Sequence, residues 1–147
     1  MVHSPKRKLF LDLILSIFRL NGLLIAQGDD MTRDLGLTSA RWRVIGVVAL
    51  SSAGVTVPGI ARVLGQSRQA VQRITDVMVS DGLLEYAPNP KHKKSVLVHL
   101  SESGKEAYSR LREVQDPWAI EATDDMTVES LETSLHVIRR LIQKFDK

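Results

Sequence analysis

Residues 56–100 read TVPGIARVLGQSRQAVQRITDVMVSDGLLEYAPNPKHKKSVLVHL, and this stretch decides the fold that the sequence predicts. Its pattern indicates a short helix, a tight turn, a longer helix and a two-stranded hairpin with a basic tip. Thr56 is a suitable N-cap for the first helix, and Gly65 suits the left-handed position that often follows a helix. Only Gln66 separates this glycine from Ser67, a second N-cap. The two helices are therefore expected to meet at a sharp angle, as in a helix-turn-helix.

The second helix, expected over residues 67–81, has two distinct faces. Apolar residues recur at helical spacing and are expected to pack inward: Ala70, Val71, Ile74, Val77 and Met78. The opposite face carries Arg68, Gln69, Gln72, Arg73 and Asp76. Arginine and glutamine can each form two hydrogen bonds with the edge of guanine or adenine. This face is therefore a candidate for reading DNA bases, and the alternative is an ordinary solvated helix face.

Two alternating stretches, residues 83–87 and 96–100, are expected to form the hairpin. The loop between them, PNPKHKKS, carries Lys91, Lys93 and Lys94 and no acid. Like charges repel each other, so either an anionic partner or solvation alone must explain this loop. Beside a candidate recognition helix we favour a wing that contacts DNA phosphates, because phosphate contacts give affinity and register while base contacts specify sequence.

Length, charge and cysteine content limit the possible classes of protein. The 147 residues fit one domain with a real core, and the net charge is +3. The basic residues gather at the amino terminus, in the second helix and in the wing, whereas residues 118–138 contain no Lys or Arg. This uneven distribution of positive charge suits a protein with one surface that binds nucleic acid. The chain has no cysteine, so disulfides, thiolate metal sites and a thiol-based effector response are excluded.

Apolar stripes mark helices at both ends of the chain. The first helix is expected over residues 9–27, with Leu9, Phe10, Leu13, Ile14, Ile17, Leu20, Leu24 and Ile25. The last is expected over 127–146, with Thr127 as N-cap and near-heptad spacing of Val128, Leu131, Leu135, Ile138, Leu141 or Ile142, and Phe145. Either the core or a second copy of the chain must cover such stripes. We expect a homodimer with an interface of Leu13, Ile17, Leu20, Leu131, Leu135, Ile138 and Ile142.

The sequence predicts a frayed start over residues 1–8, before the first stripe, and a connecting loop over residues 28–36, after it. A helix is expected over residues 39–51, with Arg41 and Arg43 outward and the inward residues Trp42, Val44, Ile45, Val47, Val48 and Leu50. Ser101 is a good N-cap for a long helix that links the wing to the last helix, over residues 101–121. Pro117 is expected to kink or break it.

No stretch is expected to enter a membrane. The apolar run near the amino terminus is interrupted by Asp12 and Arg19 and has no clean cleavage site for a signal peptidase. Nothing is judged long and apolar enough to span a bilayer. The cytoplasm is the expected location.

The sequence gives no sign of catalysis, cofactor or metal binding. His3, His92, His99 and His136 share no ligand spacing, and neither a G-x-S-x-G motif nor a glycine-rich phosphate loop is present. Trp42 is most simply a core or interface residue. A pocket for a ligand between the dimer helices and the helix-turn-helix could alternatively use Trp42 or Arg43.

Two stretches carry a resemblance to a known family: LTSARWRVIGVVA at residues 37–49, and residues 55–104, which end in VLVHLSESG. With helical stripes at both ends, the chain resembles the MarR (multiple antibiotic resistance regulator) family of transcription regulators over almost its whole length. The resemblance implies a mainly α fold with a small β wing, a winged helix-turn-helix over residues 37–100, and dimerisation through the first and last helices. It also implies a repressor on near-palindromic DNA, relieved by a small-molecule effector. The alternative is a winged helix that mediates protein interactions or assembly without sequence-specific DNA binding.

The resemblance also assigns residues to the two parts of the DNA interface. The recognition-helix readers would be Ser67, Arg68, Gln69, Gln72 and Arg73. The wing residues would be Lys91, His92, Lys93 and Lys94. In the family an Asp usually stands where this chain has His92, and an Arg where it has Lys94. Because lysine lacks the planar fork of arginine and the orienting carboxylate is absent, we expect this wing to contact phosphates rather than enter the minor groove.

Overall fold

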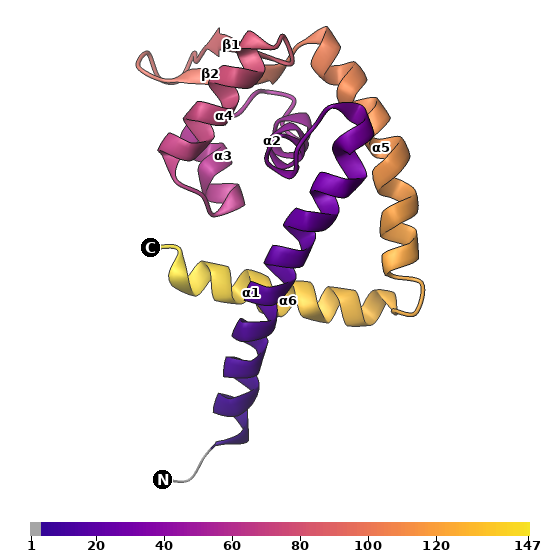
Figure 1. Cartoon of the computed structure of the whole chain (residues 1–147). Helices are drawn as coiled ribbons and strands as arrows, with labels where there is room; N and C mark the ends of the chain where they lie inside the picture. Colours follow the sequence, from indigo (N-terminus) through magenta and orange to yellow (C-terminus); the bar gives the residue numbers. More distant parts are fainter. Residues whose placement is uncertain (1–3) are drawn as a thin grey trace. The chain divides into compact units, whose positions relative to one another are not determined.

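The computed structural model describes residues 4–147, so His3 and the first part of the expected frayed start lie outside the described residues. The fold is mainly helical with a small two-stranded wing, as predicted (Figure 1). The chain forms two compact units, one up to Val114 and one over Gln115–Lys147. The elements in order are α1 (Pro5–Thr32), the 3-10 helix η1 (Arg33–Leu35), α2 (Ser39–Ala49), α3 (Val57–Leu64), α4 (Arg68–Ser80), β1 (Leu84–Pro88), β2 (Val96–Leu100), α5 (Glu102–Ala122) and α6 (Val128–Phe145).

The core of the first unit lies between α2, α3, α4, the hairpin and the start of α5. Its fully buried side chains include Ile45, Ile60, Val71, Met78, Leu84, Val98 and Leu111. Two residues expected inside are exposed instead. Leu50 is 85% exposed because α2 ends at Ala49, and Val77 is 45% exposed. Thr75 is buried in α4, and its hydroxyl donates to the backbone oxygen of Val71 one turn earlier, which satisfies the polar group.

The helix-turn-helix forms where local signals predict it. The Thr56 hydroxyl accepts from the Gly59 amide at 3.1 Å, and the Ser67 hydroxyl accepts from the Ala70 amide at 3.1 Å. Gly65 adopts φ +63°, a left-handed conformation that glycine adopts without steric cost. The predicted caps and turn are therefore confirmed. The recognition helix α4 begins and ends one residue inside the predicted range.

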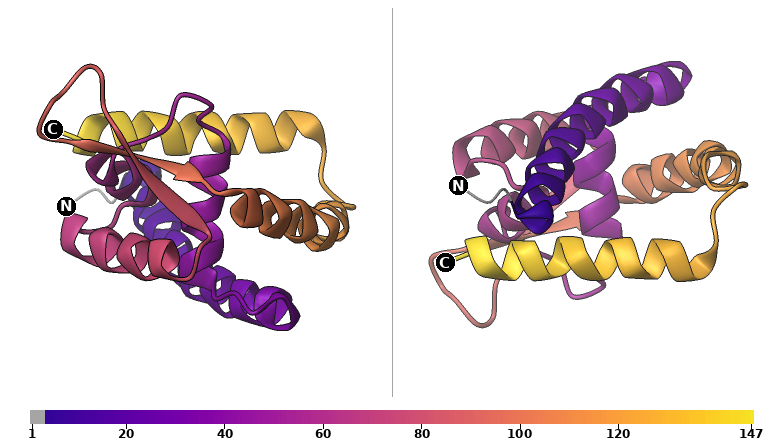
Figure 2. Two further views of the ribbon diagram at one scale, coloured as in Figure 1. Left: turned by 90° about the horizontal axis from the view of Figure 1, so that it is seen from above. Right: turned by 90° about the horizontal axis from the view of Figure 1, so that it is seen from below.

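The hairpin pairs antiparallel with Leu84 opposite Leu100 and Pro88 opposite Val96, so β1 is shifted by one residue from the expected 83–87. Val55, which precedes α3, forms an isolated bridge with Val98 and so joins the helix-turn-helix to the sheet. In both views of Figure 2 the loop at the tip of the hairpin extends beyond the helix-turn-helix. The hairpin thus presents its tip as a wing.

The prediction of a connecting loop over residues 28–36 is wrong. Helix α1 continues to Thr32, and η1 follows it directly. Two polar residues of this segment, Asp29 and Thr32, make tertiary contacts. An Asp29 carboxylate oxygen accepts from the Ser39 amide at 2.7 Å and so binds the start of α2, while Thr32 is fully buried. The expected fraying is also wrong for residues 5–8, because α1 starts at Pro5.

The judgement that nothing is long enough to span a bilayer is wrong as well. The helical stretch Pro5–Leu35 has 31 residues and a mean hydropathy of 1.9 in its most apolar window, which satisfies length and composition. By itself this is weak evidence, because signal sequences and core helices meet the same criteria.

Helix α5 runs through Pro117 without a break, and the kink that was the alternative expectation stays a prediction. The cap at Ser101 is confirmed, since its hydroxyl accepts from the Gly104 amide at 3.0 Å. In the second unit Thr127 caps α6 as predicted, accepting from the Ser130 amide at 3.1 Å. Helix α6 has no buried residue.

Candidate nucleic-acid interface

The exposed face of α4 collects all five of the predicted readers. Each of them is exposed, namely Ser67, Arg68, Gln69, Gln72 and Arg73. Burial of Val71 and Met78 on the opposite side fixes which way this face points. Ser67 uses its hydroxyl to cap the helix and leaves the other four side chains at the surface. Two arginines and two glutamines therefore present donors and acceptors on one helix face.

Gln72 differs from the other readers because other side chains hold it. Its amide nitrogen lies 2.9 Å from Asp76 Oδ1, one turn further along α4, and 3.0 Å from the Tyr86 hydroxyl on β1. The Tyr86 hydroxyl in turn donates to the same Asp76 oxygen at 2.5 Å. Helix α4 is thereby bonded to the first strand of the hairpin through a triangle of side chains, Gln72, Asp76 and Tyr86.

This triangle changes the acid–base properties of its members. The hydrogen bond from Tyr86, followed by that from Gln72, lowers the pKa of Asp76 because both stabilise the carboxylate. Burial, followed by the hydrogen bond to Asp76, raises the pKa of Tyr86. Asp76 is therefore ionised and Tyr86 neutral around neutral pH. Sequence reasoning missed Tyr86, since nothing in the alternation of β1 shows that its hydroxyl meets α4.

The wing loop has a defined shape with its basic side chains outward. Lys91, His92, Lys93 and Lys94 are all exposed. Asn89 organises the loop: its side-chain oxygen accepts from the Lys91 amide at 3.0 Å, and its side-chain nitrogen donates to the Ser95 hydroxyl at 3.0 Å. Asn89 was also missed, although asparagine is a typical turn-forming residue. A basic tip held in this way can meet a phosphate backbone without ordering a flexible loop.

Arg41 and Arg43 do not lie on the outer side of α2 as predicted, because both are half-buried. Arg41 forms an ion pair of 2.8 Å with Asp81, the residue after α4. The Arg43 Nε–H donates to the Ser39 carbonyl oxygen at 3.3 Å. With the side-chain oxygen of Gln66 turned toward the guanidinium, both terminal nitrogens of Arg43 donate to that oxygen at 3.1 Å. These arginines therefore hold the helix-turn-helix on α2.

Trp42 packs where α1 and α2 approach each other closely. A Cβ atom placed on Gly28 would lie 2.7 Å from the Trp42 ring, so only glycine permits this contact. The packing supports the core alternative for Trp42. The ligand role considered for Trp42 and Arg43 stays a prediction.

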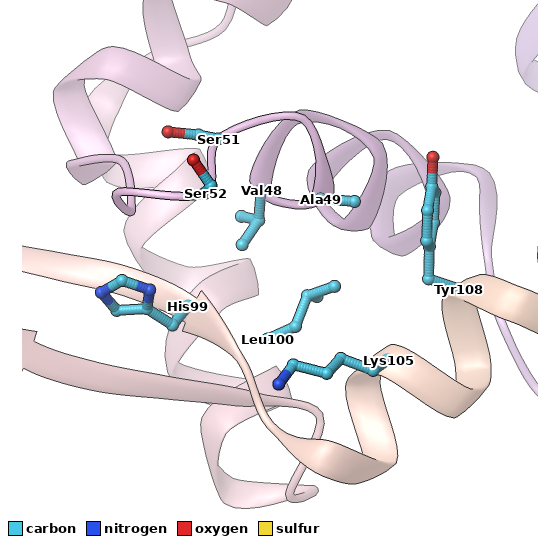
Figure 3. A pocket seen from close by; sticks show the side chains of 8 residues that line it. All are labelled: Val48, Ala49, Ser51, Ser52, His99, Leu100, Lys105 and Tyr108. Carbon is cyan, nitrogen blue, oxygen red and sulfur yellow. The ribbon is translucent and has the colours of Figure 1, made fainter.

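One cavity of the first unit, about 350 Å³, lies between the end of α2, β2 and the start of α5 (Figure 3). It is lined by Val48, Ala49, Ser51, Ser52, His99, Leu100, Lys105 and Tyr108. The polar ends of His99, Lys105 and Tyr108 point in different directions in Figure 3 and do not converge on one point. The Lys105 ammonium also pairs with Glu102 at 2.9 Å. The cavity therefore lacks the convergent donors of a built ligand site.

Metal ligands are not gathered anywhere in residues 4–147, where no group of three or more His, Asp and Glu side chains is placed to hold an ion.

Comparison with known proteins gives consistent results. A MarR family model matches residues 35–95. An uncharacterised protein of Mycobacterium tuberculosis is 38% identical over 124 residues, which cover 77% of this chain and 85% of the relative. A mutant of E. coli MarR in complex with operator DNA has a TM-score of 0.68 at 24% identity, covering 88% of this chain and 96% of the other. CouR from Rhodococcus jostii bound to p-coumaroyl-CoA has a TM-score of 0.80 at 14% identity, covering 89% and 92%.

Proposed function

Because the chain belongs to the MarR family of winged helix-turn-helix transcription regulators, we propose that it binds a specific DNA sequence as a homodimer. The family and the fold are those of transcription regulators and not of enzymes. The observation that carries the proposal is the exposed arginine and glutamine face of α4 beside a basic wing. The wing presents Lys91, Lys93 and Lys94 on a loop that is shaped by Asn89.

The two parts of this interface suit different contacts. An α-helix fits the major groove, where Arg and Gln side chains read base edges. Lysines on a projecting loop neutralise phosphates and bind all sequences alike. Operator DNA bound by the related fold of E. coli MarR supports the same use here. A cytoplasmic location is part of this proposal, because the protein has to reach DNA.

Exposed apolar side chains on α1 and on α6 support the proposed homodimer. Leu9, a member of the predicted stripe, and Leu15 and Phe18, which lie outside it, are 66–68% exposed, so the apolar surface of α1 extends beyond that stripe. A helix of this kind is normally buried. The predicted interface residues of α6 are 38–56% exposed, namely Leu131, Leu135, Ile138 and Ile142. A second copy of the chain would cover these residues together with Leu13, Ile17 and Leu20 of α1.

A bilayer is a poorer partner for α1 than a second subunit. Asp12 and Arg19 interrupt its apolar run, and each charge near the centre of a bilayer costs about 2.5–3.5 kcal/mol. A dimer places such charges at the rim of an interface, where they stay hydrated. Two-fold symmetry then predicts two half-sites and a near-palindromic operator.

We further propose that the protein represses transcription where its operator overlaps a promoter, and that a small molecule relieves the binding. The similar fold of CouR with bound p-coumaroyl-CoA supports an effector of this general kind. The effector does not act on a thiol, because the chain has no cysteine. Mild peroxide followed by reductant should therefore leave DNA affinity unchanged.

Retention on DNA tests the proposed function. The purified protein should shift a fragment of the DNA upstream of its own gene in the presence of excess unrelated DNA. If unrelated DNA competes equally well, the proposal fails. The remaining candidate is then a winged helix that mediates protein interactions or assembly.

Sedimentation tests the dimer separately. The wild-type protein should sediment with the mass of two chains at micromolar concentration. The double variant Leu131→Glu/Leu135→Glu should be monomeric or insoluble, whereas Thr133→Glu, on the opposite side of the same helix, should remain a dimer. A wild-type mass of one chain would overturn the dimer.

A further inference from the structure

We propose that Tyr86 is a positioning residue for DNA recognition: together with Asp76 it holds the Gln72 amide in one place, and this sets the base preference at the position that Gln72 contacts. The inference rests on the proposed DNA binding and names a residue outside α4 that determines its specificity. Tyr86 lies on β1 and acts through Gln72 rather than by touching a base.

Three short contacts join the side chains. The Gln72 amide nitrogen lies 2.9 Å from Asp76 Oδ1 and 3.0 Å from the Tyr86 hydroxyl oxygen, and these two oxygens are themselves 2.5 Å apart. They therefore subtend about 50° at the nitrogen, whereas the two N–H bonds of an amide diverge by about 120°. The two oxygens share one amide hydrogen, and the other hydrogen and the amide oxygen of Gln72 remain for a further partner.

The charge on Asp76 fixes which end of the amide faces it. Rotating the Gln72 amide by half a turn would place its oxygen against the carboxylate, and two acceptors would then face each other. Hydrogen bonds to an ionised group are shorter and stronger than those between neutral groups, so the observed orientation is favoured. The hydrogen bonds from Tyr86 and Gln72 also lower the pKa of Asp76, which keeps this carboxylate charged around neutral pH.

Tyr86 in turn anchors Asp76, which is an exposed side chain. The Tyr86 hydroxyl donates to Asp76 Oδ1 and also lies 3.2 Å from the Thr75 hydroxyl oxygen. Thr75 is fully buried, and its own hydroxyl donates to the Val71 carbonyl oxygen. The exposed pair of Gln72 and Asp76 is therefore bonded to a half-buried phenol, whose position is set by β1 and by a buried side chain of α4.

Holding a side chain before DNA arrives changes recognition, because ordering a long side chain at an interface weakens binding by roughly two- to tenfold. A reader that is already ordered avoids this loss, and a reader held in one orientation favours one base over the others. Gln69 provides the contrast. It is exposed on the same helix face three residues earlier, and within residues 4–147 no side chain holds it by a hydrogen bond.

Side-chain NMR of the free protein tests the positioning without DNA. The heteronuclear NOE of the Gln72 side-chain amide nitrogen should exceed that of Gln69, and each signal is assigned by its loss in Gln72→Ala or Gln69→Ala. Tyr86→Phe keeps the ring and removes the hydroxyl, so it should lower the NOE of Gln72 toward that of Gln69. Tyr108→Phe, which removes a phenol hydroxyl from α5, should leave the NOE unchanged. A wild-type Gln72 amide as mobile as that of Gln69 overturns the inference.

Selection from random DNA measures the effect on recognition. The base pair that Gln72 contacts is the position that loses its preference in Gln72→Ala. Tyr86→Phe should reduce the preference at that position about threefold or more and change every other selected position less than about twofold. A loss of stability alone would weaken binding to all sequences alike. In a Gln72→Ala background, Tyr86→Phe should alter no base preference, because it acts through Gln72.

Asp76→Ala tests the same contact if Tyr86→Phe does not fold. Asp76 is exposed, and its carboxylate is the acceptor that Gln72 and Tyr86 share. Asp76→Ala should reduce the preference at the Gln72 position by a similar factor. It should have no such effect in the Gln72→Ala background, which excludes a direct contact between Asp76 and that base.

The outcomes separate this inference from the proposed function. A Tyr86→Phe variant that keeps its full preference at the Gln72 position, or that loses preference at all positions alike, overturns the positioning role while DNA recognition stands. Sequence selection in which no position responds to Gln72→Ala overturns it as well. If the protein selects no sequence at all, the proposed function fails and the inference fails with it.

Discussion

Arg41 of α2 lies 2.8 Å from Asp81, the residue directly after the recognition helix, and the two side chains form an ion pair. The pair fixes the carboxyl-terminal end of α4, while the Gln72–Asp76–Tyr86 triangle connects the middle of the same helix to the wing. Reading DNA bases would need a helix face held in a fixed orientation. These two sets of contacts hold α4 in place, one through Arg41, which precedes α4 in the chain, and one through Tyr86, which follows it.

The Arg41–Asp81 pair should make a modest contribution to stability. The two side chains are 27% and 46% exposed, so solvent screens much of their attraction. Arg41→Ala should lower the free energy of unfolding by about 1 kcal/mol, measured by urea denaturation. Lys105→Ala is the control, because its pair with Glu102 is far more exposed, at 62% and 89%. Equal losses from both variants would contradict the structural role of Arg41.

Gly104 should resist substitution at the junction between the wing and α5. A Cβ atom there would lie 2.0 Å from the Leu83 carbonyl oxygen, which also accepts from the Ser101 amide. Because backbone must move, Gly104→Ala should destabilise the protein by about 1–3 kcal/mol. Gly46, in α2, has no atom within 4 Å of its ideal Cβ, so Gly46→Ala should stabilise by roughly 0.5–1 kcal/mol. Thermal unfolding of both variants measures the two changes in stability. A Gly104→Ala variant as stable as the wild type would contradict the prediction.

The contact between Tyr86 and Asp76 should make stability depend on pH. The lowered pKa of Asp76 gives stabilisation that is present above its unfolded-state pKa and is lost as pH falls through the folded-state pKa. The raised pKa of Tyr86 gives stabilisation that is present below its unfolded-state pKa and is lost as pH rises through the folded-state pKa. The stability difference between wild type and Tyr86→Phe should therefore be largest from about pH 5 to pH 9 and shrink on both sides.

Urea denaturation across this pH range measures the effect. Tyr108→Phe is the control, since it removes a phenol hydroxyl from α5 rather than from β1. A difference between wild type and Tyr86→Phe that does not shrink as the pH is lowered through the acid unfolding range would contradict the assigned contact, because protonation of Asp76 removes the carboxylate that Tyr86 stabilises.

Local signals explain why the sequence predicts the helix-turn-helix well. Thr56, Gly65 and Ser67 act within a few residues of themselves, so their caps and turn are visible in the sequence. The end of α1 is not visible in the sequence, because it depends on distant contacts. Asp29 accepts from the Ser39 amide ten residues away, and Thr32 is buried by tertiary packing. A polar segment that serves such contacts has the same composition as a loop.

The candidate site shows the same division. Helical periodicity alone places the readers on one exposed face, and the acid-free loop marks the wing. The Gln72–Tyr86 contact joins residues fourteen apart on a helix and a strand, and periodicity does not record such pairs. Arg41 was placed outward for a similar reason, since its partner Asp81 lies forty positions further along the chain.

The last prediction concerns how the recognition helix and the wing divide the work of binding. Arg73→Ala should relax preference at one base pair by about 1–3 kcal/mol, because Arg73 is exposed on α4 and is proposed to read a base edge. The triple change of Lys91, Lys93 and Lys94 to Ala should keep the preferred sequence and weaken binding to all sequences alike. Each lost phosphate contact should reduce the slope of log affinity against log salt by roughly one.

Both variants must be measured at the same salt concentrations, because affinity ratios change with salt. His92→Ala is a suitable control for the wing, since it alters the same loop without removing a lysine. It should change the salt slope less than the triple lysine variant. If the triple variant changes the preferred bases while Arg73→Ala does not, the wing reads sequence. Lys94 would then enter the minor groove without the Asp–Arg arrangement usual in the family, and the roles of the helix and the wing would be reversed.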